Sequence, residues 1–391
     1  MTFQNNRNKI IYLSLVIFFV FVSLLHYFSQ RPLWTDENAL LPSISTKNFY
    51  NAFTADFLVH YQICPRGFLI LTKFLAQPFD YHVLGLRFVS LFSMLLGFLI
   101  WMKHYRRAFT EDWVFILAAM SFAVSFRMMY YAAEFKPYAT ELLVVAVFFL
   151  FLNYQKQYED KPPDVKLYAS VVLLPFLLLF SYAGFLVFWI VGYNFLGMIG
   201  KNRKIVVPLI IYSLVSLAVL ALIYAVDMHG LFEKHPQDDY WMPYFLCRDS
   251  LGCFMETFFE GVQRFATWWF ADKKIFKVMA SPFIGLFLYA LVRYGFGGLI
   301  KARFKIFDIN ALTAVLFSEL FLLGILKKYP FMGERITLFF APFVFYLVVK
   351  GICDLRRFKP ALYLFGAYYV GFLIACGINS FLHCLGLYFP L

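Results

Sequence analysis

Two adjacent carboxylates, Asp36 and Glu37, are the first residues of this chain whose type and position could serve catalysis. They lie in the stretch LWTDENAL, residues 33–40, a few residues beyond the first long apolar run. Apolar neighbours such as Leu33 and Trp34 would hold both acids against a hydrophobic surface, where desolvation raises a carboxyl pKa and improves the carboxylate as a base. The alternative is a pair of solvated loop acids. The flanking residues favour catalytic roles for Asp36 and Glu37.

A second group of polar side chains lies in a short turn between two apolar runs. The stretch MMYYAAEFKPYATELL, residues 128–143, contains Glu134, Lys136 and Tyr138. Pro137 suits the first turn of the following helix, because a proline lacks the N–H that a helix start leaves unpaired. We interpret Glu134, Lys136 and Tyr138 as substrate-binding residues. A surface turn with a local ion pair is the alternative.

Three arginines lie at or just inside the ends of apolar runs. Arg335 begins the run that follows KKYPFMGE, and Arg87 and Arg127 each lie about four residues inside a predicted membrane span. A guanidinium donates two parallel hydrogen bonds to a phosphate, and a charge within a span is costly enough to indicate a functional site. All three are therefore predicted to bind substrate. Anchoring of these side chains at the membrane surface is the alternative.

Other candidate motifs are weaker. His229, Glu233 and His235 have the side chains of metal ligands, so a divalent metal is an option, but two histidines in a loop are typical of a solvated segment. Asp238 and Asp239 resemble half of an acidic nucleotide-sugar motif, yet they fall on the outer side, where nucleotide sugars are scarce. No cofactor is predicted with certainty. The sequence contains no phosphate-binding glycine loop, dinucleotide fingerprint or serine-nucleophile motif.

The composition places these residues in a membrane protein. Of the 391 residues, 62% are hydrophobic and 15% are charged, whereas about a quarter of the residues in a soluble domain are charged. The net charge of +12 could indicate nucleic-acid binding, but the Lys and Arg residues gather in short linkers and form no basic stripe. We therefore expect no nucleic-acid partner. The fold class expected is all-α, as one polytopic membrane domain over residues 1–391.

Eleven apolar runs are long enough, or nearly so, to cross a membrane as helices. About 20 helical residues span the hydrocarbon core. The first run has no signal-peptide cleavage pattern at its end, so it is expected to remain as a span. The predicted spans are 10–28, 84–102, 113–131, 137–153, 166–182, 184–199, 205–226, 278–292, 309–326, 336–350 and 361–380.

Linkers rich in Lys and Arg give the orientation of these spans. KHYRR at residues 103–107 is one of several basic linkers that all fall on one side of an eleven-span chain. By the positive-inside rule this side is the cytoplasm, so the N-terminus is cytoplasmic and the C-terminus is outside. The two long connections, 29–83 and 227–277, are then extracytoplasmic.

Both long connections contain more than loop structure. In the first, residues 46–59 and 69–79 suit helices lying in the membrane interface. In the second, the aromatic run WWF at 268–270 suits either an interfacial anchor or the packed core of the connection itself. Cys247 and Cys253 would form a small disulfide in an oxidising compartment or remain as two free thiols.

The predicted topology brings the candidate residues to one place. This topology is derived from the basic linkers alone and does not use the candidate residues. It nevertheless places six of them at the outer leaflet: Asp36, Glu37, Arg87, Arg127, Lys136 and Arg335. A carboxylate base beside several cations suits the release of a lipid phosphate with activation of an acceptor hydroxyl. A transporter or flippase of lipid-linked sugars is the main alternative, but it calls for broken helices and polar residues at mid-span, where this chain is mostly apolar. A non-catalytic scaffold would not need Asp36.

Several stretches resemble the bacterial GT-C superfamily of membrane glycosyltransferases. They are LWTDENAL, YQICPRGFLILTKFL (61–75), GLRFVSLFSMLLG (85–97) and YYAAEFKPYATELL (130–143). The likeness is closest to the protein-mannosyltransferase-like branch, which includes the lipid A aminoarabinose transferases. It covers roughly residues 30–150, is poor thereafter, and returns at YPFMGERITLFFAP.

The resemblance implies a helical enzyme of the bacterial inner membrane that transfers a sugar from a polyprenyl phosphate, with inversion. The acceptor would be a hydroxyl of a lipid, glycan or protein, in a cavity at the outer leaflet. Asp36 matches the acid of the family's first outer loop, and Glu37 occupies the adjacent acidic position. Lys136 matches the basic residue of the YAxExRxY-like turn, and Arg335 the arginine after the last outer loop. Lysine at 136 departs from the family's arginine and would bind phosphate as a point charge.

Overall fold

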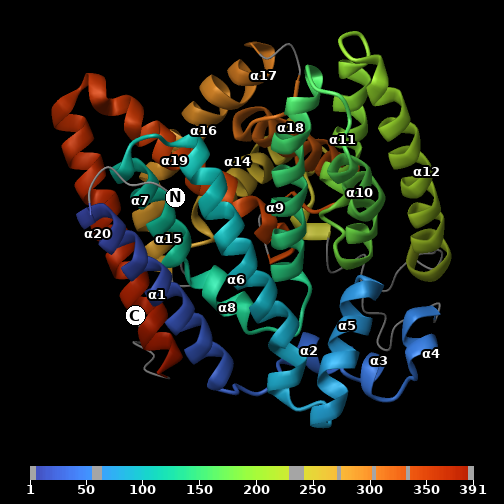
Figure 1. The fold of residues 1–391 in the computed structure, drawn as a ribbon. Coiled ribbons are helices and arrows are strands. Elements are labelled where there is room, and N and C mark those ends of the chain that lie inside the picture. The colour runs from blue at the N-terminus through green and yellow to red at the C-terminus, as the bar shows by residue number, and fades with distance from the viewer. Residues whose placement is uncertain are drawn as a thin grey trace.

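The described part of the chain folds into helices joined by turns and short loops (Figure 1). This computed structural model describes residues 6–54, 64–228, 242–270, 274–301, 305–331 and 335–385, and no strand occurs within these ranges. Apolar runs form helices because a helix pairs its internal backbone N–H and C=O groups within itself, as a lipid environment requires. The all-α prediction is confirmed.

Seven helical segments in the described part of the chain are long and apolar enough to cross a membrane. An eighth is added if α7 (Asp112–Ala123) and α8 (Phe126–Ala132), which are bent by 52° at a short break, count as one span. A multi-pass membrane protein is therefore supported. The seven are α1 (Asn6–Phe28), α6 (Val83–Ala108), α9 with the turn after it (Tyr138–Glu159), α12 with its flanking turns (Arg203–Asp227), α16 to α17 (Pro282–Lys301), η10 with α19 and the following turn (Arg335–Arg357), and α20 (Lys359–Cys384).

Three further apolar helices are shorter than a full crossing. They are α10 (Val165–Leu173) with the 3-10 helix η4 (Leu174–Phe180), α11 (Phe185–Met198) and α18 (Ile309–Ile325). Each predicted span thus coincides with an apolar helix, but those long enough to cross number seven or eight, and eleven crossings are not established. In contrast, predicted spans 137–153 and 336–350 belong to segments of 22 and 23 residues, longer than expected.

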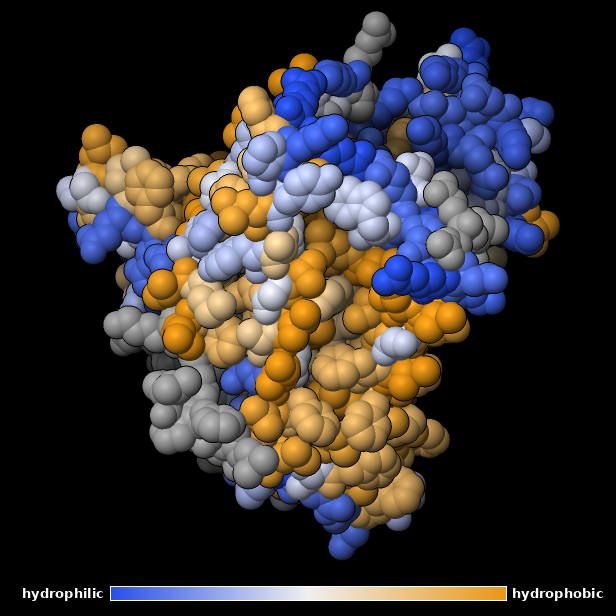
Figure 2. Space-filling view, turned by 90° about the vertical axis from the view of Figure 1, so that its left-hand side faces the viewer, coloured by the Kyte–Doolittle hydropathy of each residue, from blue (hydrophilic) through white to orange (hydrophobic). Residues whose placement is uncertain are grey.

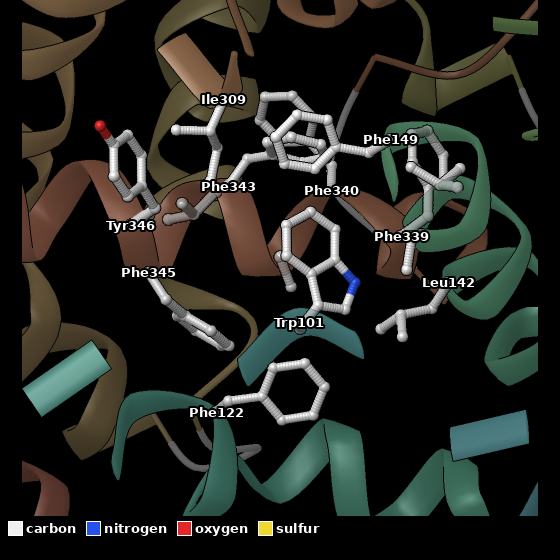
Figure 3. Close-up of a cluster of buried hydrophobic side chains, with 14 of the residues drawn as sticks. Trp101, Phe122, Leu142, Phe149, Ile309, Phe339, Phe340, Phe343, Phe345 and Tyr346 are labelled. Atoms are coloured by element: carbon white, nitrogen blue, oxygen red, sulfur yellow. The ribbon is translucent and has the colours of Figure 1, made fainter. Parts of the chain in front are cut away.

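The centre of the bundle is an aromatic cluster between α6, α9 (Tyr138–Gln155) and α19 (Ala341–Asp354). Trp101 of α6 is fully buried and meets Phe343 of α19 edge to face, with ring centroids 4.8 Å apart. Figure 3 shows the rings of Phe122, Phe340 and Phe343 around this indole. Large rings packed in this way fix α19 in the middle of the bundle, where 83% of its apolar segment is buried.

The peripheral helices turn apolar side chains outward. On α12 (Val206–Ile223), Leu214 and Leu217 are 63% and 65% exposed. Figure 2 shows hydrophobic residues over the middle of one face of the molecule, with hydrophilic residues at its upper end and lower tip. An apolar surface of this extent is not stable in water, so it indicates contact with lipid.

Short helices of the first long connection gather at the lower end of the bundle in Figure 1. They are α2 (Thr35–Leu40), α3 (Pro42–Ser45), α4 (Phe49–Thr54), α5 (Arg66–Ala76) and the 3-10 helix η2 (Gln77–Phe79). The predicted helix over 46–59 is present in its described part, α4, and the run 69–79 lies in α5 and η2. A Cβ atom on Gly67 of α5 would lie 2.7 Å from the carbonyl oxygen of Leu179, so α5 packs against η4 only because residue 67 is glycine.

The aromatic run 268–270 of the second long connection is buried. It follows the amphipathic helix α14 (Leu251–Thr267) and precedes α15 (Lys274–Ala280). The backbone carbonyls of Trp269 and Phe270 accept N–H groups of α8 that the break after α7 leaves without partners in the helix. The interfacial-anchor interpretation is therefore wrong, because all three side chains are buried. The packed alternative holds only in part, since Phe270 packs against Phe345 of α19 and Phe372 of α20, in the bundle and not in a core of the connection itself.

A disulfide links Cys247 to Cys253 just before and within the first turn of α14. The hydroxyl of Ser250 accepts the backbone N–H of Cys253 over 3.1 Å and so caps the start of this helix. Of the two alternatives for these cysteines, the disulfide is the one that the structure contains.

Candidate active site

Asp36 and Glu37 lie side by side in the first turn of α2 but have different surroundings. The backbone N–H of Trp34 donates to Glu37 Oε2 over 3.2 Å, which is one half of a helix capping box. Negative charge is favourable in this turn because the helix start presents unpaired N–H groups. Glu37 is fully buried, whereas the Asp36 side chain is 26% exposed. The two acids are therefore suited to different tasks.

Glu37 and Arg87 form a buried ion pair. Arg87 Nε and Nη2 donate to the two carboxylate oxygens over 2.9 and 2.8 Å, and both side chains are inaccessible. The backbone N–H of Phe135 also donates to Glu37 Oε1, over 2.7 Å, so each Glu37 oxygen accepts two hydrogen bonds. Arg87 donates further to the carbonyl oxygen of Arg31 over 2.9 Å. The pair ties the first connection to α6 and to the turn between α8 and α9.

Asp36 contacts a residue from the other end of the chain. Arg335, the first residue of the 3-10 helix η10 (Arg335–Phe340), has its Nη2 atom 2.5 Å from Asp36 Oδ2. The Arg335 guanidinium also lies over the ring of Trp34, 4.9 Å from its centroid, in a cation–π contact. The Arg335 side chain is 12% exposed. Unlike the pair behind it, this ion pair is partly open to its surroundings.

Glu134 joins the same group through Trp34. The indole N–H donates to Glu134 Oε1 over 2.9 Å, and Oε2 is buried with no hydrogen-bond partner among the described residues. Burial raises the pKa of Glu134 to about 7, and the nearby Glu37 carboxylate adds to this effect. Glu134 is therefore largely neutral below pH 7, which leaves Asp36 as the acid that compensates Arg335.

Lys136 and Tyr138 flank the Asp36–Arg335 pair. Lys136 is 5% exposed, and burial lowers its pKa although the charges of Asp36 and Glu134 act in the opposite direction. Tyr138 opens α9 and interacts electrostatically with Arg335 and Asp36. Both side chains therefore belong to the electrostatic surroundings of Arg335.

Arg127 is connected to this group through aromatic rings. Its guanidinium lies over the ring of Trp268, 4.4 Å from the centroid. Trp268 stacks on Tyr131 at 5.9 Å, and Tyr131 meets Tyr138 edge to face at 5.4 Å. The end of the second long connection therefore closes one side of the site.

The structure thus gathers most of the predicted site residues in one region. Glu37 and Arg87 lie behind it as a buried support. In front of it lies the open ion pair of Asp36 and Arg335, and the residues connected to this pair are Arg127, Glu134, Lys136 and Tyr138.

A neighbouring polar group does not stand out in the sequence. Arg66 Nε lies 3.3 Å from Asp227 Oδ1, and the Tyr182 hydroxyl donates to Asp227 Oδ2 over 2.6 Å. Cys64 is fully buried and interacts electrostatically with Lys136, Asp227 and Arg66, which places this group next to the site. Two signals could have found it: a basic residue after Pro65 in an outer connection, and an acid directly after a predicted span.

The candidate metal ligands fall outside the described residues. His229, Glu233, His235, Asp238 and Asp239 all belong to the stretch 229–241, which the structure does not describe. Within the ranges that it does describe, no group of three His, Cys, Asp or Glu side chains could hold a metal ion.

The arrangement can bind an anion and accept a proton at neighbouring atoms. Arg335 and Lys136 supply positive charge, and Asp36 is the carboxylate of the group that is partly exposed. Comparison of the chain with models of protein families gives no match, and comparison with curated proteins gives none either. The function is therefore inferred from the site.

Proposed function

We propose that this chain is a membrane glycosyltransferase of the GT-C type that moves a sugar from a polyprenyl phosphate to an acceptor hydroxyl. One observation carries the proposal, the contact between the carboxylate of Asp36 and the guanidinium of Arg335. Lys136 and Tyr138 interact electrostatically with this pair. A base beside two cations suits a reaction in which a hydroxyl loses a proton while a departing phosphate gains charge.

In the proposed mechanism the donor phosphate competes with Asp36 for Arg335. A phosphate accepts two parallel hydrogen bonds from a guanidinium, so its arrival draws Arg335 away from the carboxylate. Asp36 then accepts the proton of the acceptor hydroxyl, whose oxygen attacks the anomeric carbon. The bond from that carbon to the phosphate oxygen breaks, and the sugar is transferred with inversion. Arg335 and Lys136 stabilise the charge on the departing polyprenyl phosphate.

Glu37 and Arg87 have a positioning role in this scheme. Each Glu37 oxygen already accepts two hydrogen bonds, so this carboxylate cannot take a proton without losing its pairing with Arg87. The pair holds the first turn of α2 against α6, and Asp36 in that turn faces Arg335 as a result. The proposal therefore gives the catalytic task to Asp36 alone.

The proposed topology has eleven spans and a cytoplasmic N-terminus, with the site at the outer surface of a bacterial inner membrane. It counts the three shorter apolar helices and the bent α7–α8 pair as spans. The basic linker 103–107 lies at the end of α6 away from Arg87, in agreement with the positive-inside rule. The disulfide Cys247–Cys253 in the second long connection supports an oxidising compartment on the side of the site.

Transfer of label from radiolabelled polyprenyl-phosphate sugars tests the proposal. Membranes with wild type, Asp36→Asn or Asp80→Asn receive a set of labelled donors, and the label that leaves the lipid is measured. Asp80 is an exposed acid of the same connection with a φ of 50°, which asparagine also adopts, so its variant is a matched control. We expect the control to match wild type and Asp36→Asn to lose about 10²–10⁴-fold, the usual contribution of a positioned base.

Three other results would count against the proposal. Equal transfer by wild type and Asp36→Asn would remove Asp36 from the mechanism. A loss of the same size in Asp80→Asn would point to damaged folding. Labelled lipid that crosses the bilayer with its sugar still attached would favour the alternative, a transporter or flippase of lipid-linked sugars.

A further inference from the structure

A cavity of about 300 Å³ lies at the opposite end of the bundle from Asp36. It is formed by the end of α6, the linker before α7, the end of α19 and the 3-10 helix η11 (Leu355–Arg357). Along α6, Arg87 of the candidate active site and Ala108 of the cavity are about 21 residues apart, roughly 32 Å at 1.5 Å per residue. Six charged or thiol side chains contribute to its wall: Glu111, Lys350, Cys353, Asp354, Arg356 and Arg357.

Glu111, one of the two acids of this cavity, is neutralised by Arg356. The two Nη atoms of Arg356 lie 2.5 and 2.7 Å from the two oxygens of Glu111. The indole N–H of Trp113 donates to Glu111 as well, over 2.8 Å, and the Arg356 guanidinium lies over the ring of Trp113. The charge of Arg356 is therefore compensated within the cavity wall.

Asp354, the other acid, is neutralised from the neighbouring helix α16 (Pro282–Ala290) and the turn η9 (Leu291–Phe296). The Tyr289 hydroxyl donates to Asp354 over 2.9 Å, and Arg293 lies 3.4 Å away. Lys350 and Arg357, in contrast, form no ion pair with any carboxylate in the part of the chain that the structure describes. Lys350 Nζ lies over the ring of Tyr294, 4.9 Å from its centroid, and so meets a neutral partner. The two cations therefore leave the cavity with a net positive charge for a ligand.

Exposed aromatic side chains surround the cavity. Trp113 and Tyr289 are each 41% exposed, and Phe358, next to Arg357, is 69% exposed. Trp and Tyr gather in this way where a membrane protein meets the headgroup region. A basic cavity between membrane helices, bordered by exposed rings, suits a ligand with an anionic head and apolar chains.

We propose that this cavity binds the phosphate headgroup of an anionic membrane lipid. Lys350 contacts the phosphate as a point charge and Arg357 as a forked donor, and the acyl chains follow Trp113 and Phe358 along the outside of the bundle. In the proposed topology the lipid belongs to the cytoplasmic leaflet. The site does not depend on the glycosyltransferase assignment.

Native mass spectrometry of the full-length protein in detergent tests this proposal. Phosphatidylglycerol and phosphatidylcholine with the same acyl chains are titrated against wild type and Lys350→Gln/Arg357→Gln. We expect wild type to prefer phosphatidylglycerol and the double variant to bind it about 25-fold more weakly, since each cation near a lipid headgroup contributes about fivefold. Binding of phosphatidylcholine should not change.

A charge-matched control separates the cavity from the general basic surface. Arg203→Gln/Lys204→Gln removes two exposed cations from the linker between α11 and α12, away from the cavity, and should bind phosphatidylglycerol like wild type. Equal weakening in both double variants, or no weakening in either, would overturn the proposal. If the first double variant does not fold, Arg357→Gln alone changes an exposed side chain and should weaken binding about fivefold.

Cys353 provides a readout inside the cavity, because it is a free thiol in the cavity wall. Its rate of maleimide labelling, measured by peptide mass spectrometry, should fall several-fold when phosphatidylglycerol is added and should not respond to inorganic phosphate. Slowing by inorganic phosphate alone would identify a free-anion site and contradict a lipid. An unchanged rate with phosphatidylglycerol would show that the lipid binds elsewhere.

Discussion

Asp36 and Glu37 should respond differently to the loss of their charges. Glu37→Gln leaves the Arg87 guanidinium buried without a counter-charge, with an amide NH₂ facing one of its two donating groups. Removal of one partner from a buried ion pair costs about 3–5 kcal/mol. The Asp36–Arg335 pair is partly open, with side chains 26% and 12% exposed, so Asp36→Asn should cost about 1–2 kcal/mol, between the values for an exposed and a buried pair.

Thermal unfolding in detergent, followed by intrinsic fluorescence, measures this difference. An unfolding entropy of about 2.1 cal/mol/K per residue gives a chain of 391 residues a shift of about 1.2 °C per kcal/mol. Glu37→Gln should therefore lower the midpoint by about 4–6 °C, and Asp36→Asn by only about 1–2 °C. Only the second variant should lose transfer activity while its stability is retained.

A double variant tests whether the uncompensated charge of Arg87 causes the lower unfolding midpoint of Glu37→Gln. Glu37→Gln/Arg87→Met has no uncompensated charge at this place. Its unfolding midpoint should therefore fall by less than the sum of the decreases in Glu37→Gln and Arg87→Met. A wild-type midpoint in Glu37→Gln, or a larger loss in Asp36→Asn, would refute the assignment of Glu37 to support and Asp36 to chemistry.

The pH dependence of stability should change in Glu134→Gln. Burial raises the pKa of Glu134 from 4.5 to about 7. The stability linked to its neutral form is therefore complete below pH 4.5 and is lost as the pH rises through 7. Between pH 5 and 8.5 the unfolding midpoint of wild type should fall, and that of the variant should change less. Arg335→Lys keeps the charge but loses the forked donor, so kcat/KM for the donor should fall by about tenfold to a hundredfold, the effect of one charge-assisted hydrogen bond. Gly67→Ala puts a Cβ atom 2.7 Å from the Leu179 carbonyl oxygen and should lower the unfolding midpoint, whereas Gly366→Ala meets nothing within 4 Å and should not.

Each of these three predictions has a result that would contradict it. Identical pH profiles for wild type and Glu134→Gln would show that this carboxyl titrates in the usual range. Unchanged donor kinetics in Arg335→Lys would argue against paired hydrogen bonds from Arg335 to a phosphate. A wild-type midpoint in Gly67→Ala would mean that α5 can move away from η4 at little cost.

The helices could be predicted from the sequence because apolar runs have few other options in lipid. Their lengths could not be predicted equally well. The predicted spans 166–182 and 184–199 end and begin around the turn at Tyr182 and Ala183, and the buried Glu141 carboxylate of α9 interacts with the backbone N–H groups of these two residues. A contact between distant segments therefore fixes the break, and no local pattern contains it.

The location of the site was predictable to the extent that it depends on topology. Span ends alone put Asp36, Lys136 and Arg335 at one end of the bundle. The division of labour between Asp36 and Glu37 was not predictable, because it depends on which acid meets Arg87 from α6 and the backbone N–H of the following turn. The Arg66–Asp227 pair was not predicted for the same reason, since its two residues come from separate connections.

In the proposed reaction the protein breaks the bond between a sugar and a polyprenyl phosphate. Purified protein in liposomes, given a doubly labelled donor and a membrane extract that supplies acceptors, tests it most directly through product analysis. We expect wild type to release polyprenyl phosphate in an amount equal to the sugar transferred, and Asp36→Asn to release almost none. A donor that keeps its sugar with wild type, while moving between leaflets, would contradict the claim.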